Sequence, residues 1–243
     1  MRVPLAGAIS MVQAHPMRLK ILIPLLLLAA CGRPLTDGEE AFARAFHGDG
    51  LDTSKIKVIR NPLIKLYVDT VPYPPRTTCS ENIHPPPKET HFTGSPGAAV
   101  LFNKITINPD AYAPDYLKSW PKTANLRAAM FMAHEFVHVW QWQNRDRTKY
   151  HPLKAAREHR WKEDPYLFDL DTNTRFLDYA YEQQGAIAAE YVCCAALAPK
   201  AARTERLRAL LAQEFPIDQL HKTLPQTPVL IPWKGADLDR ICS

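Results

Sequence analysis

The sequence lacks three features that would assign it to a common class: a long apolar run, a strong excess of one charge, and an internal repeat. Its apolar run at 21–30 is much shorter than the roughly 20 residues that a membrane-spanning helix needs. Residues 1–30 hold 3 of the 30 basic residues and none of the 25 acidic ones, so the remainder carries 27 basic and 25 acidic residues. That near balance gives no electrostatic reason to expect a nucleic-acid partner. With 46% hydrophobic residues, the chain predicts one globular domain over 31–243.

Residues 1–30 look like an export signal, in which basic residues precede the short apolar run. The run ends in Leu28-Ala-Ala-Cys31-Gly32, which is similar to the lipobox of bacterial lipoproteins. The resemblance implies that Cys31 carries lipid after the signal is removed. It also implies that Gly32 directs the protein to the periplasmic face of the outer membrane. The alternative is an ordinary secreted protein in which Cys31 is incidental.

Four cysteines remain if Cys31 is used for lipid, and an even number in an oxidising compartment allows two disulfides. Cys193 and Cys194 are adjacent on a predicted helix and point about 100° apart, so they should not pair with each other. We predict that one bonds to Cys79 and the other to Cys242. Free buried thiols are the alternative.

The most informative stretch is 126–143, an apolar run with the pattern HExxH at its centre. On a helix, His134 and His138 lie on one side about one turn apart, where two imidazoles bind one metal ion. Glu135 lies beside that face and would act as the general base on a zinc-bound water. Apolar residues recur at helical spacing along the same stretch, which predicts a buried amphipathic helix. A core helix whose histidines only bond to neighbours is the alternative.

A catalytic zinc site uses three protein ligands, and HExxH supplies two of them. Gln141 and Asn144 stand where a metzincin needs Gly and His, so the third ligand must come from elsewhere. We predict Glu182, because small residues at 185, 186 and 189 allow its helix to lie against the HExxH helix. Glu190 is the second candidate, either as a ligand or as a residue that orients a ligating histidine. Asp178, His151 and His159 are weaker candidates.

The remaining patterns predict an α+β fold with a small mixed sheet packed on the HExxH helix and the second ligand helix. A strand or hairpin at 98–108 would offer an open edge to an extended peptide. Thr123 is the expected cap of the HExxH helix, and His47 is expected on the surface. We expect further helices over 36–47, 176–198 and 200–215, strands over 55–59 and 64–68, and an irregular proline-rich loop over 70–97. Residues 144–172 are expected to form a solvated linker with one helix, with a substrate-shaping insert as the alternative, and the tail from 216 is expected to be extended strand or loop.

The segments His134-Glu-Phe-Val-His-Val-Trp-Gln141 and Tyr181-Glu-Gln-Gln-Gly-Ala-Ile187 resemble the zincin-like domains of Vgr-related and contractile-injection-system core proteins of bacteria. The similarity covers roughly residues 36–192. It implies a gluzincin site, with His134, His138 and a downstream glutamate as zinc ligands and Glu135 as the catalytic acid and base. Domains of this family often carry a Glu-x-x-Ala-Asp pattern on the second helix. This sequence departs from the pattern, because Glu182-Gln-Gln-Gly-Ala lacks the acidic residue four positions after the glutamate.

The sequence therefore predicts a monomeric, lipid-anchored zinc metallopeptidase that hydrolyses peptide bonds of a peptide or protein substrate in the cell envelope. A non-catalytic metal-binding assembly module of the envelope or a secretion system is one alternative, and a zinc amidase on cell-wall peptides is another. An oxyanion-stabilising donor cannot be chosen among Tyr181, Tyr191 and His221.

Overall fold

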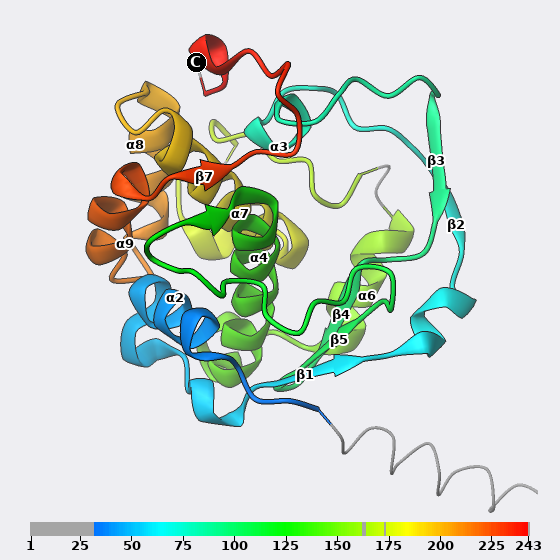
Figure 1. Ribbon diagram of the computed structural model, residues 1–243. Helices are drawn as coiled ribbons and strands as arrows, with labels where there is room; N and C mark the ends of the chain where they lie inside the picture. Colours follow the sequence, from blue (N-terminus) through cyan, green and yellow to red (C-terminus); the bar gives the residue numbers. More distant parts are fainter. Residues whose placement is uncertain (1–31, 162–163, 173, 243) are drawn as a thin grey trace, which may run out of the picture. The chain divides into compact units, whose positions relative to one another are not determined.

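The computed structural model describes residues 32–161, 164–172 and 174–242 and has the predicted α+β fold (Figure 1). The expected signal and Cys31 lie outside these residues. Within the described part of the chain, no helix is long and apolar enough to cross a membrane. In chain order the elements are α2 (Asp37–His47), η1 (Gly48–Gly50), η2 (Thr53–Lys55), β1 (Lys57–Arg60), η3 (Pro62–Leu66), β2 (Asp69–Pro72), α3 (Cys79–Asn82), β3 (His91–Gly94), β4 (Ala98–Leu101), β5 (Lys104–Ile107), β6 (Ala124–Asn125), α4 (Leu126–Gln143), α5 (Arg145–Thr148), α6 (Pro152–Trp161), η4 (Phe176–Asp178), α7 (Tyr181–Leu197), α8 (Ala202–Leu211), α9 (Asp218–Thr223), η5 (Leu224–Gln226), β7 (Val229–Leu230) and η6 (Leu238–Arg240).

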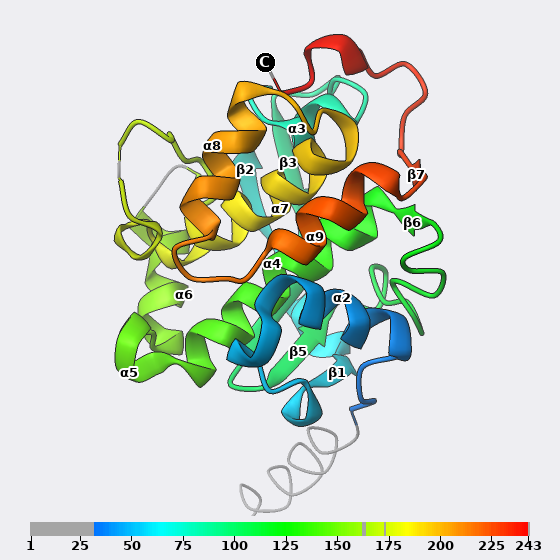
Figure 2. The same cartoon turned by 90° about the vertical axis from the view of Figure 1, so that its left-hand side faces the viewer.

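Helices α4 and α7 pack against each other and are the two elements that form the candidate site (Figures 1 and 2). Helix α4 begins at Leu126, slightly later than the sequence predicts, because Asn125 rather than Thr123 is its cap. The Asn125 side-chain oxygen accepts a hydrogen bond from the Ala128 N–H at 3.1 Å. Thr123 cannot cap the helix because Ala124 and Asn125 first pair with β7 as the short strand β6.

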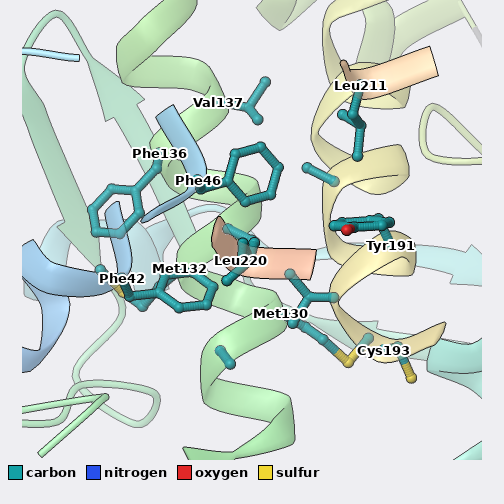
Figure 3. Packing of buried hydrophobic residues seen from close by; sticks show 14 of the residues in the cluster. Phe42, Phe46, Met130, Met132, Phe136, Val137, Tyr191, Cys193, Leu211 and Leu220 are labelled. Carbon is teal, nitrogen blue, oxygen red and sulfur yellow. The ribbon is translucent and has the colours of Figure 1, made fainter. Parts of the chain in front are cut away.

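The hydrophobic core lies between α4, α7 and the helices that cover them (Figure 3). Side chains from α2 reach one side of α4, and α7 contributes from the other. Each large apolar side chain that is fully buried stabilises the fold by about 1.5–3 kcal/mol, so this cluster fixes how α4 and α7 lie. Its central members are Phe42, Phe46, Met130, Met132, Phe136, Val137, Tyr191, Cys193, Leu211 and Leu220.

His47 belongs to this core, and its expected surface position is wrong. Only 1% of the residue is exposed, and its ring stacks on Phe46 at 4.7 Å and meets Phe215 edge-on at 4.9 Å. Neither ring nitrogen has a hydrogen-bond partner among the described residues. Burial therefore lowers the pKa of His47 to about 3.

The main sheet has three strands in the order β1-β5-β4. Strand β1 runs parallel to β5, whereas β4 and β5 form the predicted antiparallel hairpin, with Val100 opposite Ile105. The hairpin turns at Phe102, whose φ of 60° is in the left-handed region and whose ring packs on Trp142 at 4.5 Å. Among the described strands, β4 pairs on one side only, so its other edge is open.

Two predictions for the region after β1 are wrong. Residues 64–68 do not form a strand, because Asn61 caps the 3₁₀-helix η3 by accepting from the Leu63 N–H, and Pro62 favours the first helical turn. The proline-rich stretch 70–97 is not wholly irregular. It contains the antiparallel pair β2 and β3 and the short helix α3, although most of β2 and β3 is exposed.

Two disulfides join other parts of the chain to α7. Cys79 of α3 bonds to Cys193, and Cys242 near the C-terminus bonds to Cys194. This is the predicted arrangement, and it also fixes which neighbour takes which partner. In the tail, Leu207, Leu210 and Leu211 point inward from α8 as expected. The expected extended strand or loop after 216 is wrong for the helix α9, whose Leu220 lies in the core, but β7 is a short strand there.

Candidate metal centre

Three side chains from α4 and α7 converge on one point. The Nε2 atoms of His134 and His138 lie 3.0 Å apart, and each lies 3.2 Å from Oε2 of Glu182. In a tetrahedral zinc site with bonds of about 2.0–2.1 Å, neighbouring ligand atoms lie about 3.3 Å apart. The three atoms thus have the mutual spacing of ligands around one metal ion, and the residues fit a metal centre.

Gly185 lets α7 come this close to α4. A methyl group at that position would lie 2.6 Å from Cε1 and 2.7 Å from Nδ1 of His134, which is closer than unbonded atoms approach. The residue is in mid-helix, where glycine normally costs about 1 kcal/mol relative to alanine. Glycine is present because the His134 ring occupies the space of a side chain. The predicted small-residue face of α7 therefore lies against the HExxH helix.

Hydrogen bonds behind His138 hold its ring in the orientation that a metal ligand needs. Its Nδ1 lies 2.9 Å from Oε1 of Gln141, an acceptor, so Nδ1 carries a proton and Nε2 is the atom left to bind a metal ion. Gln141 in turn donates to the Tyr181 carbonyl and to Oε1 of Gln184, at 3.1 and 3.0 Å. Both glutamines are buried, so α4 and α7 are tied together directly behind the site.

Glu182 is held from the other side by helix α6. Oε1 of Glu182 lies 3.1 Å from Nε2 of His159. The adjacent Glu158 accepts hydrogen bonds from the Tyr181 and Glu182 N–H groups, both at 3.0 Å, at the start of α7. Helix α6 is mostly exposed, as the expected solvated segment would be, but His159 and Glu158 also make it part of the candidate site.

The electrostatics of the cluster favour an added positive charge. Burial alone would raise the pKa of Glu182, but the charge of His138 and hydrogen bonds from His134, His138 and His159 hold it well below its usual range. Burial likewise disfavours protonated His138, yet the charge and hydrogen bond of Glu182, together with the charge of Glu135, raise its pKa to about 9. A cation bound by these residues would take the place of that proton.

Glu135 lies beside the cluster and is only 6% exposed. Burial raises the pKa of its carboxyl, the nearby His134 and His138 oppose the rise, and the Glu182 charge adds to it. A raised carboxyl pKa suits a group that first accepts a proton and then donates it. The His134 side chain is 15% exposed, so the site is open to solvent on its side.

Glu190, the second candidate for the third ligand, is not at this site. Its Oε1 accepts from Nε of Arg203, and its Oε2 accepts from the Cys79 N–H, both at 2.8 Å. The eight-residue offset from Glu182 carries Glu190 around α7 to the disulfide side. It therefore anchors the segment around Cys79 and does not orient a ligating histidine.

The other candidates divide in the same way. Asp178 pairs with Arg175, and Nδ1 of His151 accepts from the Leu153 N–H, so neither joins the metal cluster. Of the three oxyanion candidates, the Tyr181 hydroxyl donates to the Lys149 carbonyl. Tyr191 and His221 bond to each other at 3.2 Å.

Two tyrosines that the sequence did not indicate do face the histidines. The Tyr166 ring lies 5.7 Å from the His134 ring and 5.8 Å from the His159 ring. The Tyr150 ring lies 6.5 Å from that of His138. Neither tyrosine belongs to a motif, so only the fold reveals them.

No model of a known protein family matches this chain, and no curated protein does so. Among solved structures, the effector domain of Pseudomonas aeruginosa VgrG2b is similar, with a TM-score of 0.46 and 20% sequence identity. The match covers 80% of this chain and 96% of that domain.

Proposed function

We propose that this chain is a zinc-dependent metallopeptidase that hydrolyses peptide bonds. The observation that carries the proposal is the convergence of His134, His138 and Glu182 at 3.0–3.2 Å beside the buried carboxyl of Glu135. A metal site with only a structural role needs no adjacent carboxyl group with a raised pKa. The Glu135 environment therefore favours catalysis over the non-catalytic alternative.

The donor set suits zinc. Imidazole nitrogens and one carboxylate oxygen are ligands that zinc prefers, and a set of three protein ligands leaves one position for a reactant. Zinc held there would supply a Lewis acid that polarises a water molecule and a peptide carbonyl. Glu135 would accept the proton of the attacking water and deliver it to the leaving amine.

The carbonyl oxygen gains negative charge during the reaction and needs a donor. We assign this role to the phenol of Tyr166, because its ring lies within 6 Å of the rings of both His134 and His159. Desolvation and the charges of Glu182 and Glu135 raise the pKa of Tyr166, so its hydroxyl keeps the proton that it would donate. Replacing Tyr166 by phenylalanine tests this role, with loss of turnover and retention of zinc as the expected result.

The position of β4 supports the proposal that an extended peptide binds across the site. A methyl group on Gly97 would lie 3.9 Å from the Phe131 ring, and Phe102 contacts Trp142, so β4 runs alongside α4 in the same direction. From Phe131 to Trp142 the helix rises about 16 Å, which matches the span of about 16 Å from Gly97 to Phe102 in a strand. The histidines are then level with Ala99. A peptide paired with the open edge of β4 would pass the site there.

The location belongs to the proposal as well. We infer export and a lipid anchor at Cys31 from the lipobox-like residues 28–32, and we therefore propose that the domain acts in the bacterial cell envelope. The two disulfides agree with an oxidising compartment. Labelling cells with a radioactive fatty acid tests the anchor, since Cys31→Ser should remove the label.

The peptidase is tested with the zinc-loaded chain and its Glu135→Gln variant. Both are incubated with unfolded casein and with a degenerate peptide library, and their zinc content is measured. We expect one zinc per chain in both proteins and hydrolysis by the unaltered chain alone, with turnover reduced at least about a hundredfold in the variant. Equal activity of the two proteins would refute the role of Glu135.

A further inference from the structure

A cavity of about 510 Å³ lies beside the first turn of α4. Gly97, which directly precedes β4, lies at this cavity, and Phe92 of β3 lines it. Lys65, Asp110 and Arg127 supply its charged groups. None of these residues belongs to the metal centre.

The cavity has one cation without a counterion. Nζ of Lys65 lies 2.6 Å from Oδ1 of Asp110, so these two charges neutralise each other. Arg127 is exposed and forms no ion pair with any residue that the structure describes. The net charge of the lining groups is therefore positive, and Arg127 is free to bind an anion. A guanidinium group suits a carboxylate because it can donate two parallel hydrogen bonds.

Arg127 also lies on the face of α4 that carries the ligands. It precedes His134 by seven residues, which is about two helical turns, or about 10 Å along the axis. Phe131 lies between them on the same face and is level with Gly97. The cavity is therefore reached from the metal centre by following α4 and β4 together toward their N-terminal ends.

We propose that this cavity is a specificity site that binds an acidic side chain of the substrate, with Arg127 as the residue that recognises it. A peptide on β4 passes the histidines level with Ala99 and advances about 3.3 Å per residue, so a side chain two to four residues from the cleaved bond reaches the cavity. Phe92 would pack on the methylene groups of a bound glutamate. This inference rests on the proposed peptidase function.

The first test compares cleavage of a degenerate peptide library by the unaltered chain, Arg127→Ala and Arg127→Glu. Arg145→Ala is the matched control, because Arg145 is an exposed arginine that packs on Trp142 at the far end of α4. We expect Asp and Glu to be enriched at one position two to four residues from the cut. Arg127→Ala should lower turnover of the acidic substrates about two- to fivefold and Arg127→Glu should favour Lys and Arg there, whereas Arg145→Ala changes neither. Cleavage without an acidic preference, or a preference that survives Arg127→Glu, would overturn the specificity site and leave the peptidase standing.

The second test uses binding and does not depend on turnover. Fluorescein-labelled degenerate peptides with a fixed central glutamate or glutamine are titrated onto the zinc-loaded Glu135→Gln chain. The glutamate pool should bind about two- to fivefold more tightly, and Arg127→Ala in the same background should remove the difference. Asp110→Asn should increase it, because Lys65 then loses its partner. If the peptides bind with this preference but are never cut, the proposed chemistry fails and the acidic site stands; equal binding of both pools refutes the acidic site.

Discussion

The contact between Gly185 and His134 makes the substitution Gly185→Ala a sharp probe of the metal centre. A methyl group at this position would lie 2.6 Å from Cε1 of His134. Unbonded carbon atoms lie at least about 3.5 Å apart, so the imidazole must move by about 0.9 Å. Metal–ligand distances tolerate about 0.2 Å, and disturbing the orientation of a ligand weakens metal binding about 10- to 100-fold. We therefore expect zinc affinity to fall by a factor in this range.

The same substitution should not unfold the metal-free protein. Alanine is favoured over glycine in a helix by about 1 kcal/mol, and the clash is with a side chain that can rotate once no metal holds it. Zinc affinity is measured by competition with a chromogenic chelator, and stability by urea unfolding in excess chelator. Gly50→Ala is the control, because its methyl group would lie 3.5 Å from Nε1 of Trp140 in ordinary contact. A Gly185→Ala protein that binds zinc as tightly as the unaltered chain would refute the close approach of α7 to His134.

Three further predictions follow from buried groups. Glu182→Gln should weaken zinc at least about a hundredfold. Glu190→Gln should leave zinc affinity unchanged and lower the free energy of unfolding by about 1.5–3 kcal/mol, because it weakens the charged hydrogen bonds that the buried carboxylate accepts from Arg203 and the Cys79 N–H; the reverse order would exchange their roles. The pKa of His47 is about 3 in the folded chain and about 6.5 in the unfolded chain. Below pH 6.5 the unfolded chain therefore binds a proton that the folded chain does not, and the free energy of unfolding falls by about 2 kcal/mol at pH 5. His47→Phe should remove this loss, and an unchanged pH profile of urea unfolding would contradict it. Replacing Cys194 and Cys242 together by serine opens a link across 48 positions and should cost about 4 kcal/mol of unfolding free energy, whereas an unchanged urea midpoint would show that the bond does not form.

The sequence was sufficient for the parts of the site that depend on helical spacing. His134 and His138 share a face because they are one turn apart, and Gly185 showed which face of the second helix could approach them. The small residues of the second helix favoured Glu182 over Glu190 as the third ligand, but they could not decide between the two. It depends on which end of α7 meets α4, which is a property of the packed core.

The contacts that support the candidate ligands could not be predicted, because they join residues far apart in the sequence. His159 reaches Glu182 across 23 positions, and Gln141 reaches Gln184 across 43. His47 follows the same logic in the core. We expected it on the surface, but the packing of Phe215 against its ring excludes water.

The strand errors have a local cause. Residues 64–68 have the composition of a strand, but Asn61 and Pro62 start the 3₁₀-helix η3. The backbone groups of this segment then bond to one another instead of to a neighbouring strand. Strands β2 and β3 lie about 20 residues apart in the sequence and pair only because the fold brings them side by side.

The central claim is that His134, His138 and Glu182 bind one zinc ion. It is tested most directly by crystallising the zinc-loaded chain and collecting anomalous diffraction on both sides of the zinc absorption edge. The claim predicts a single strong peak about 2.0–2.2 Å from Nε2 of both histidines and from a Glu182 oxygen. A peak at other residues, or no peak in a crystal of protein that carries stoichiometric zinc in solution, would contradict it.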